Sequence, residues 1–173
     1  MTSVSLALSN FLCSKAGKKT AYIELNANNE ICSLVKNCRI DSFPYMGITI
    51  FPHRTFTSLA EILHLDYDYF VLDMGVLNAY SAKEFAKFEK QFLVCSLSKW
   101  KRKKTIEKLS MLLETTHIPP EYVTIICNCS EKESKLKVSP TISFSVISVP
   151  FIHNPFQLDT DIFPLFGKIT GQY

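Results

Sequence analysis

The sequence has no long hydrophobic run and no leader-like start. No stretch approaches the ~20 consecutive apolar residues that a membrane-spanning helix requires. No basic segment precedes an apolar one at the N-terminus, as it would in a secretory signal. We therefore expect a soluble, cytoplasmic protein without a transmembrane segment.

Patterns that bind metals or carry nucleophiles are also missing. Five residues separate Cys32 from Cys38 and one separates Cys127 from Cys129, so neither pair has the CxxC spacing of a zinc or redox site. The four histidines are scattered without an HExxH pattern, and GxSxG is absent. We expect reduced, partly buried cysteine thiols, no zinc site and no nucleophile elbow.

The composition is that of one globular domain. The chain has 173 residues, of which 47% are hydrophobic and 20% charged, enough to bury a sizeable core. We expect a single domain over residues 1–173. The formal net charge of +3 is too small to indicate nucleic-acid binding by itself.

Buried strands alternate with amphipathic helices along the chain. Continuous apolar runs such as Tyr69–Leu72 are typical of strands covered on both faces. The predicted helices are residues 3–14, 30–36, 57–66, 81–90, 103–116 and 158–167, and the predicted strands are 21–25, 69–72, 91–97, 122–129 and 143–150. Residues 41–53, with two prolines and a glycine, are a hairpin or an irregular excursion. Thr57 or Ser58 is the expected cap of its helix, with Glu61 completing a capping box. The alternation predicts an α/β fold with a mainly parallel sheet and helices on both faces.

The residues that follow each strand are the candidates for chemistry, because ligands of open parallel sheets bind at the carboxyl ends of the strands. The clearest case is "YFVLDMG", where Asp73 closes an apolar strand. A carboxylate at that place could hold a magnesium-bound water, although an aspartate is also an ordinary strand terminator. The motif alone leaves both interpretations open.

The order of several segments along the chain is a more specific signal than the Asp73 motif alone. A helix is followed by "GKKTAYIELN", "YDYFVLDMG", "FLVCSLSKW", "VTIICNC" and "ISVPFIHNP", and this order resembles the ParA/MinD family of deviant-Walker P-loop ATPases over nearly the whole chain. The resemblance implies a P-loop NTPase-like fold. It makes Thr2 the magnesium-binding hydroxyl, Asp73 the Walker B aspartate and metal-site residue, and Asn128 the residue that recognises the base. It also implies ATP and Mg2+ as cofactors of a full-length protein, and a homodimer or a partner protein.

The sequence departs from that family at the phosphate loop. The alignment places Met1 where the family has its invariant lysine, and the loop glycines and the strand before them are not among these residues. A phosphate loop needs successive backbone N–H groups and a lysine around the phosphates. Asn26, near the place of the family's activating Asp, cannot act as a base. We therefore expect poor ATPase activity and no bound cofactor for the chain as given, with Met1-Thr2-Ser3 the remnant of a longer start.

Basic residues are concentrated in one short segment around the single tryptophan. The segment comprises Lys99, Trp100, Lys101, Arg102, Lys103 and Lys104. Cations at the start of a helix oppose its macrodipole. The segment is either a solvated face or a binding site for an anionic partner, which could be DNA, an acidic membrane surface or a nucleotide.

Two functions remain open at this stage. The first is a degenerate ParA/MinD-like protein with a regulatory or scaffolding role and little or no ATPase activity. The second is an N-terminally truncated sequence of a working ParA/MinD-type ATPase. A Gly-rich segment ending in Gly-Lys, encoded in frame upstream of Met1, would distinguish the second from the first.

Overall fold

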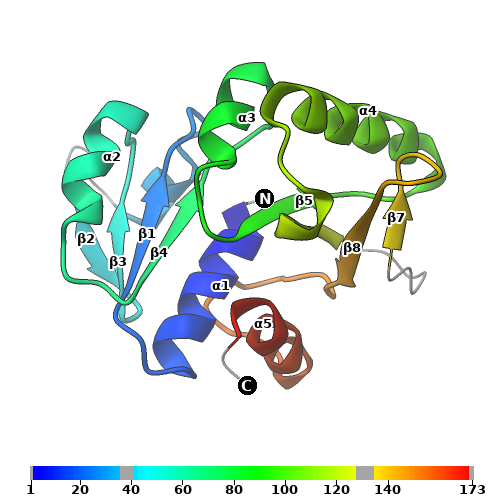
Figure 1. Cartoon of the computed structure of the whole chain (residues 1–173). Helices are drawn as coiled ribbons and strands as arrows, with labels where there is room; N and C mark the ends of the chain where they lie inside the picture. The colour runs from blue at the N-terminus through cyan, green and yellow to red at the C-terminus, as the bar shows by residue number, and fades with distance from the viewer. Residues whose placement is uncertain (1, 36–40, 128–134, 172–173) are drawn as a thin grey trace. The chain divides into compact units, whose positions relative to one another are not determined.

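The computed structural model describes residues 2–35, 41–127 and 135–171 (Figure 1). The chain forms two compact units. The first unit comprises residues up to Val76 together with those from Ile152 onward, and the second unit is Leu77–Phe151. Each unit contains its own four-stranded sheet, so each is described by itself.

The first unit is built from helices and strands in alternation (Figure 1). Its elements are α1 (Thr2–Ser14), β1 (Thr20–Glu24), the 3-10 helix η1 (Glu30–Leu34), β2 (Phe43–Tyr45), β3 (Ile48–Phe51), α2 (Phe56–Leu63), β4 (Tyr69–Asp73), the 3-10 helix η3 (Thr160–Ile162) and α5 (Phe163–Thr170). The N-cap of α2 is Thr55, whose side chain accepts a hydrogen bond from the backbone N–H of Ser58. The expected cap at Thr57 or Ser58 is therefore wrong by two to three residues, and Ser58 rather than Glu61 completes the capping box.

The sheet of the first unit has the order β2-β3-β1-β4. β1 pairs in parallel with both β3 and β4, and all five of its residues are buried, as expected for a central apolar strand. β2 and β3 form an antiparallel hairpin. Its two turn residues, Met46 and Gly47, both have positive φ, the geometry of the tight turns that match strand twist. The segment that the sequence left open is thus a hairpin.

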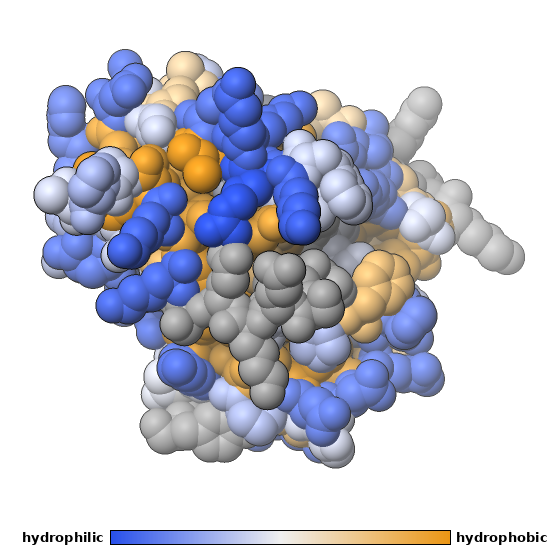
Figure 2. Space-filling view, turned by 90° about the vertical axis from the view of Figure 1, so that its right-hand side faces the viewer, coloured by the Kyte–Doolittle hydropathy of each residue, from blue (hydrophilic) through white to orange (hydrophobic). Residues whose placement is uncertain are grey.

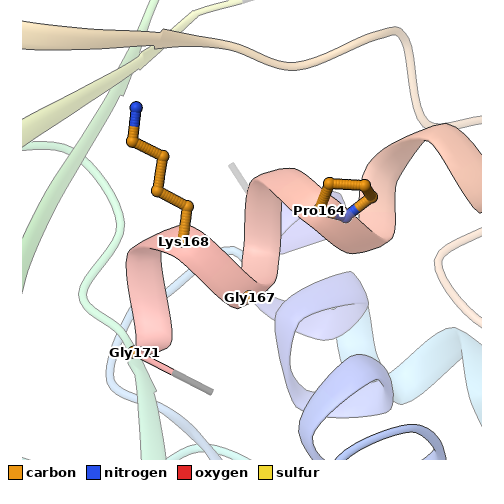
Figure 3. A pocket seen from close by; sticks show the side chains of 4 residues that line it. All are labelled: Pro164, Gly167, Lys168 and Gly171. Carbon is orange, nitrogen blue, oxygen red and sulfur yellow. The ribbon is translucent and has the colours of Figure 1, made fainter. Parts of the chain in front are cut away.

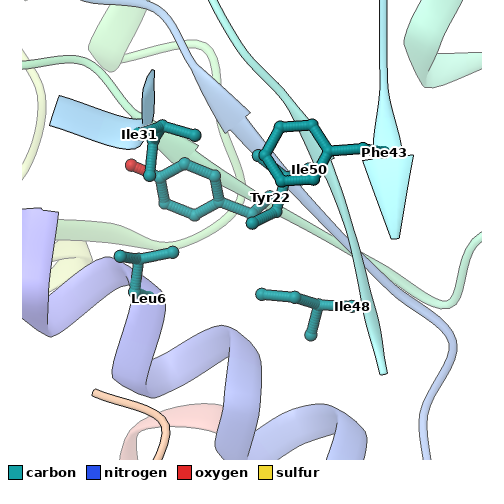
Figure 4. Close-up of a cluster of buried hydrophobic side chains, with 6 residues drawn as sticks. All are labelled: Leu6, Tyr22, Ile31, Phe43, Ile48 and Ile50. Carbon is teal, nitrogen blue, oxygen red and sulfur yellow. The ribbon is translucent and has the colours of Figure 1, made fainter. Parts of the chain in front are cut away.

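A cluster of apolar side chains fills the space between α1 and this sheet. The cluster comprises Leu6, Tyr22, Ile31, Phe43, Ile48 and Ile50 (Figure 4). Helix α1 contacts both β1 and β4, and the ring of its Phe11 lies 5.8 Å from the ring of Phe166 in α5. Because α1 is held from both sides, its first turn has a fixed place at the end of the sheet.

The second unit repeats the same plan with different strands. Its elements are α3 (Ala79–Phe85), β5 (Gln91–Cys95), α4 (Lys99–Thr116), the 3-10 helix η2 (Pro120–Tyr122), β6 (Val123–Cys127), β7 (Lys135–Lys137) and β8 (Ser143–Ser148). The sheet order is β5-β6-β8-β7, with β5, β6 and β8 parallel and β7 antiparallel to β8. Helix α3 begins at a capping box in which the Asn78 side chain accepts from two backbone N–H groups. Lys108 of α4 donates to the carbonyl oxygen of Leu77 at 2.7 Å, which ties α4 to the segment before α3.

The α/β class is confirmed, whereas the mainly parallel sheet is wrong. The strands form two mixed sheets of four, and each contains one antiparallel edge strand. The antiparallel strands β2 and β7 are three residues long and joined to their neighbours by short turns, a connection that only antiparallel pairs allow. A P-loop-like topology is not established by these sheets.

Two further expectations concern single features. Cys32 is disulfide-bonded, so the expectation of reduced thiols is wrong for this residue. No helix within the described ranges is long and apolar enough to cross a membrane.

Candidate functional site at the ends of β1 and β4

Two buried carboxyl groups lie at the carboxyl ends of neighbouring strands in the first unit. Glu24 ends β1, Asp73 ends β4, and the two are register partners in the parallel pair. Glu24 is fully buried and Asp73 is 4% exposed. The first turn of α1 brings the hydroxyl groups of Thr2 and Ser5 to the same place. The parallel pairing and the packing of α1 therefore assemble the site.

The Asp73 carboxylate accepts hydrogen bonds from several donors. Its Oδ2 atom accepts from the Thr2 hydroxyl at 2.8 Å, from the Tyr22 phenol at 3.0 Å and, at a longer 3.4 Å, from Ser5. Its Oδ1 atom accepts from the backbone N–H of Gly75 at 3.1 Å. An ionised carboxylate has about four acceptor positions. These donors fill the acceptor positions of Oδ2 and occupy one of the two positions of Oδ1.

Tyr22 connects the site to the hydrophobic core. Its ring lies within the apolar cluster (Figure 4). Its hydroxyl group donates a hydrogen bond to Asp73. Burial raises the pKa of the Tyr22 phenol well above its usual value, and the negative charge and hydrogen-bond acceptance of Asp73 raise that pKa further. The phenol therefore stays protonated and acts as a permanent donor to Asp73.

Glu24 holds the backbone of two neighbouring segments. Its Oε1 atom accepts from the N–H of Ile31 in η1, and its Oε2 atom accepts from the N–H of His53, both at 3.4 Å. The Glu24 carbonyl oxygen also accepts from the N–H of Arg54 at 2.8 Å. The Glu24 side chain is thus used to order the loops that follow β1 and β3.

The loop after β4 lies close to the loop after β1 beside this site. Gly75 has φ of +67°, and a Cβ atom placed there would lie 2.6 Å from the Cβ of Asn26. The Asn26 side chain donates to the carbonyl oxygen of Asp73 at 3.3 Å and accepts from the N–H of Asn28 at 2.9 Å. Only glycine combines this backbone conformation with this contact.

A magnesium ion, which the resemblance implies, finds few ligands in this arrangement. Mg2+ prefers oxygen ligands in octahedral geometry, with one or two carboxylates. Thr2 keeps its lone pairs, but Asp73 is nearly inaccessible and its Oδ2 atom is occupied by hydroxyl donors. Within the described part of the chain, no group of three or more His, Cys, Asp or Glu side chains could hold a metal ion. The residues as arranged do not fit a resident Mg2+.

The structure places the predicted site residues in different parts of the chain. Thr2 and Asp73, which the resemblance paired, are in direct contact. Asn128 lies outside the described residues. The basic segment forms the first turns of α4 in the second unit.

Sequence reasoning missed Tyr22, Ser5 and Gly75 as parts of the site. One available signal was the tyrosine itself, because a phenol in the middle of a buried strand needs a hydrogen-bond partner. Asp73 and Tyr22 are not register partners, since Tyr22 faces Val71. Their contact depends on how the two side chains pack in the folded protein, which the local sequence does not specify.

One pocket in the first unit lies apart from this network on α5. It is lined by Pro164, Gly167, Lys168 and Gly171 (Figure 3). Of these residues, only Lys168 has a side chain that can form hydrogen bonds. The pocket therefore carries no recognisable set of catalytic groups.

No protein-family model matches this chain, and no curated protein matches it.

Proposed function

We propose that this chain is a degenerate ParA/MinD-like protein that acts as a regulatory or scaffolding partner, with little or no ATPase activity. The resemblance of the strand and helix order supports the family, and the contact between Thr2 and Asp73 is compatible with it. The observation that carries the loss of activity is the double occupation of Asp73 Oδ2 by Thr2 and Tyr22.

The reason is a competition for acceptor positions. A Walker B carboxylate acts on a metal ion through its free lone pairs, directly or by way of a bound water. In this chain the Tyr22 phenol stays protonated and remains a donor to Asp73. Displacing it would leave a buried hydroxyl group without a partner, which costs ~1–3 kcal/mol. The carboxylate thus serves to join β1, β4 and α1.

Titration with a fluorescent ATP analogue, with and without Mg2+, tests this proposal. We expect no magnesium-dependent binding in the micromolar range, either for the wild type or for Asp73→Asn. Asp161→Asn, which changes an exposed aspartate of the same unit, is the matched control. Because Asp73 has a structural role here, Asp73→Asn should instead lower the free energy of unfolding by ~1–3 kcal/mol, and Asp161→Asn should not.

The opposite result identifies the alternative function. Micromolar, magnesium-dependent binding that is lost in Asp73→Asn and kept in Asp161→Asn would contradict the proposal. That result would support a working ATP-binding ParA/MinD-type ATPase, with Thr2 and Asp73 at its metal site.

A further inference from the structure

The first six residues of α4 form a cationic tip, defined here as residues 99–104. Five of the six are lysine or arginine, and none of the six is buried. Six residues cover more than one and a half turns of helix, and only Arg102 among them is partly buried. The helix begins to bury side chains fully at Thr105, followed by Leu109 and Leu112. The four lysines and Trp100 are therefore exposed to solvent.

Salt bridges between described residues do not account for the four lysines of the tip. The first turn of α4 has no acidic residue, and the Ser98 side chain makes no capping hydrogen bond. Among the described residues, Lys99, Lys101, Lys103 and Lys104 take part in no salt bridge. Cations at a helix N-terminus also oppose the macrodipole. The contacts of the described residues therefore give no reason in folding for the four lysines of the tip.

The tip belongs to the basic part of the chain. Leu77–Phe151 contains twelve Lys and Arg against seven Asp and Glu, whereas the rest of the sequence contains seven against nine. Hydrophilic side chains are common on the face shown in Figure 2, so exposed charge alone would not distinguish this segment. The distinguishing feature is the single sign of the charge, concentrated in five of six consecutive residues.

Trp100 gives the tip a second property. It is the only tryptophan of the chain, it lies between Lys99 and Lys101, and it is 82% exposed. Tryptophan is enriched at the interface of a bilayer with water, where its ring sits at the level of the headgroups. Clusters of lysine and arginine are attracted to anionic lipid at that same depth. The two kinds of side chain in the tip thus suit one environment.

We propose that the cationic tip docks on an acidic lipid bilayer, with the lysines at the phosphate groups and the Trp100 ring in the interface. Nucleic acid is the less suitable partner. Binders of single strands use a positively charged groove with several aromatic platforms. The tip is instead the end of one helix, with one aromatic ring and four lysines to one arginine.

Cosedimentation of the full chain with vesicles tests this inference. We compare phosphatidylcholine vesicles with vesicles that also contain phosphatidylserine, at low and at physiological salt. Binding should require phosphatidylserine and weaken with salt. Each basic residue near the surface contributes about fivefold in partitioning, so Lys101→Gln with Lys103→Gln should weaken binding about 25-fold. Lys135→Gln with Lys137→Gln, two exposed lysines of β7 in the same unit, is the charge-matched control and should change binding little.

The single tryptophan provides a second and independent readout. On binding, its emission should shift to shorter wavelength, because the ring leaves water for the interface. Trp100→Ala should weaken binding, whereas Tyr122→Ala, which removes another exposed aromatic of the same unit, should not. Circular dichroism of each variant checks that it is folded.

Three outcomes of the vesicle experiments would overturn the inference. They are the absence of binding to phosphatidylserine vesicles at low salt, an equal loss in the β7 control, and binding without a shift of the tryptophan emission. Retention of single-stranded DNA or RNA without vesicle binding would also overturn it. None of these outcomes bears on nucleotide binding by the first unit, so this proposal and the proposed function can fail separately.

Discussion

Asp73 and Tyr22 constrain each other at the scale of single residues. A buried carboxylate is costly unless donors surround it, and a buried phenol is costly without an acceptor. Their 3.0 Å contact satisfies both groups, and Thr2 adds a second strong donor. The contact therefore links the middle of β1 to the end of β4.

Replacing Tyr22 by Phe should change how stability depends on pH. In the unfolded chain a tyrosine ionises near pH 10, whereas in the folded protein the pKa of Tyr22 is raised by burial and by Asp73. Above pH 10 the unfolded state therefore loses a proton that the folded state keeps, and stability falls by about 1.4 kcal/mol per pH unit from this group. Tyr22→Phe should remove that component, as measured by urea denaturation between pH 9 and 11.

The control for this experiment is Tyr122→Phe. Tyr122 is 59% exposed, so its replacement removes a phenol while the buried one remains, and we expect the wild-type slope. At neutral pH, Tyr22→Phe should also cost ~1–3 kcal/mol because Asp73 loses a donor. An unchanged slope in Tyr22→Phe would show that the phenol is not held protonated by its surroundings.

Gly75 offers a second prediction for a single residue. Gly75→Ala should lower stability by ~2–4 kcal/mol, from the positive φ and from the clash with Asn26. Gly17→Ala is the matched control, because Gly17 has a similar φ of +63° but no atom within 4 Å of an added Cβ. It should cost only the conformational part, ~1–2 kcal/mol. Equal losses of unfolding free energy would mean that the contact with Asn26 is easily relaxed.

At the scale of secondary structure elements, α1 and α4 use their first turns differently. In the first turn of α1, Thr2 is buried and donates its hydroxyl group to Asp73, and Ser5 adds a longer hydrogen bond to the same carboxylate. The first turn of α4 is exposed, cationic and without a side-chain cap. One helix start is therefore part of the fold, and the other is available to a partner.

Neutralising the tip should slightly stabilise α4. Lys101→Gln, Lys103→Gln and Lys104→Gln each remove a charge that opposes the macrodipole, which should add a few tenths of a kcal/mol per residue at low salt. Thermal unfolding at two ionic strengths measures the effect, and the gain should shrink as salt screens the interaction. A loss of stability in the triple variant would mean that these side chains support the fold. The β7 lysines are the control here also, because they lie on a strand.

At the scale of the whole molecule, the two units share one construction. Each has three parallel strands and one short antiparallel strand at an edge, β2 in the first unit and β7 in the second. The units differ in charge, because basic residues exceed acidic ones only in Leu77–Phe151. The hydrogen bonds around Asp73 therefore lie in the unit with slightly more acidic residues, and the proposed docking surface lies in the basic unit.

Much of the secondary structure could be predicted because its signals are local. β1, β4, β5, β6 and β8 all fall on the apolar runs that predicted them, and α1 falls on its 3.6-residue pattern. Weak local signals gave the errors. β7 is a polar, three-residue strand that the sequence did not predict, and α4 begins four residues before its predicted start because its first turns contain no buried residue.

The sequence by itself determined the positions of the longer strands and of most helices, because their patterns are local. A family resemblance also predicted that Thr2 and Asp73 belong together, and the two side chains are in contact. Only the tertiary structure decided that the strands form two mixed sheets, because strand order and direction depend on contacts between distant segments. It also decided that Tyr22 reaches Asp73 and that the four lysines and Trp100 of the cationic tip are exposed. Burial and hydrogen bonding are properties of the packed chain, and no local pattern specifies them.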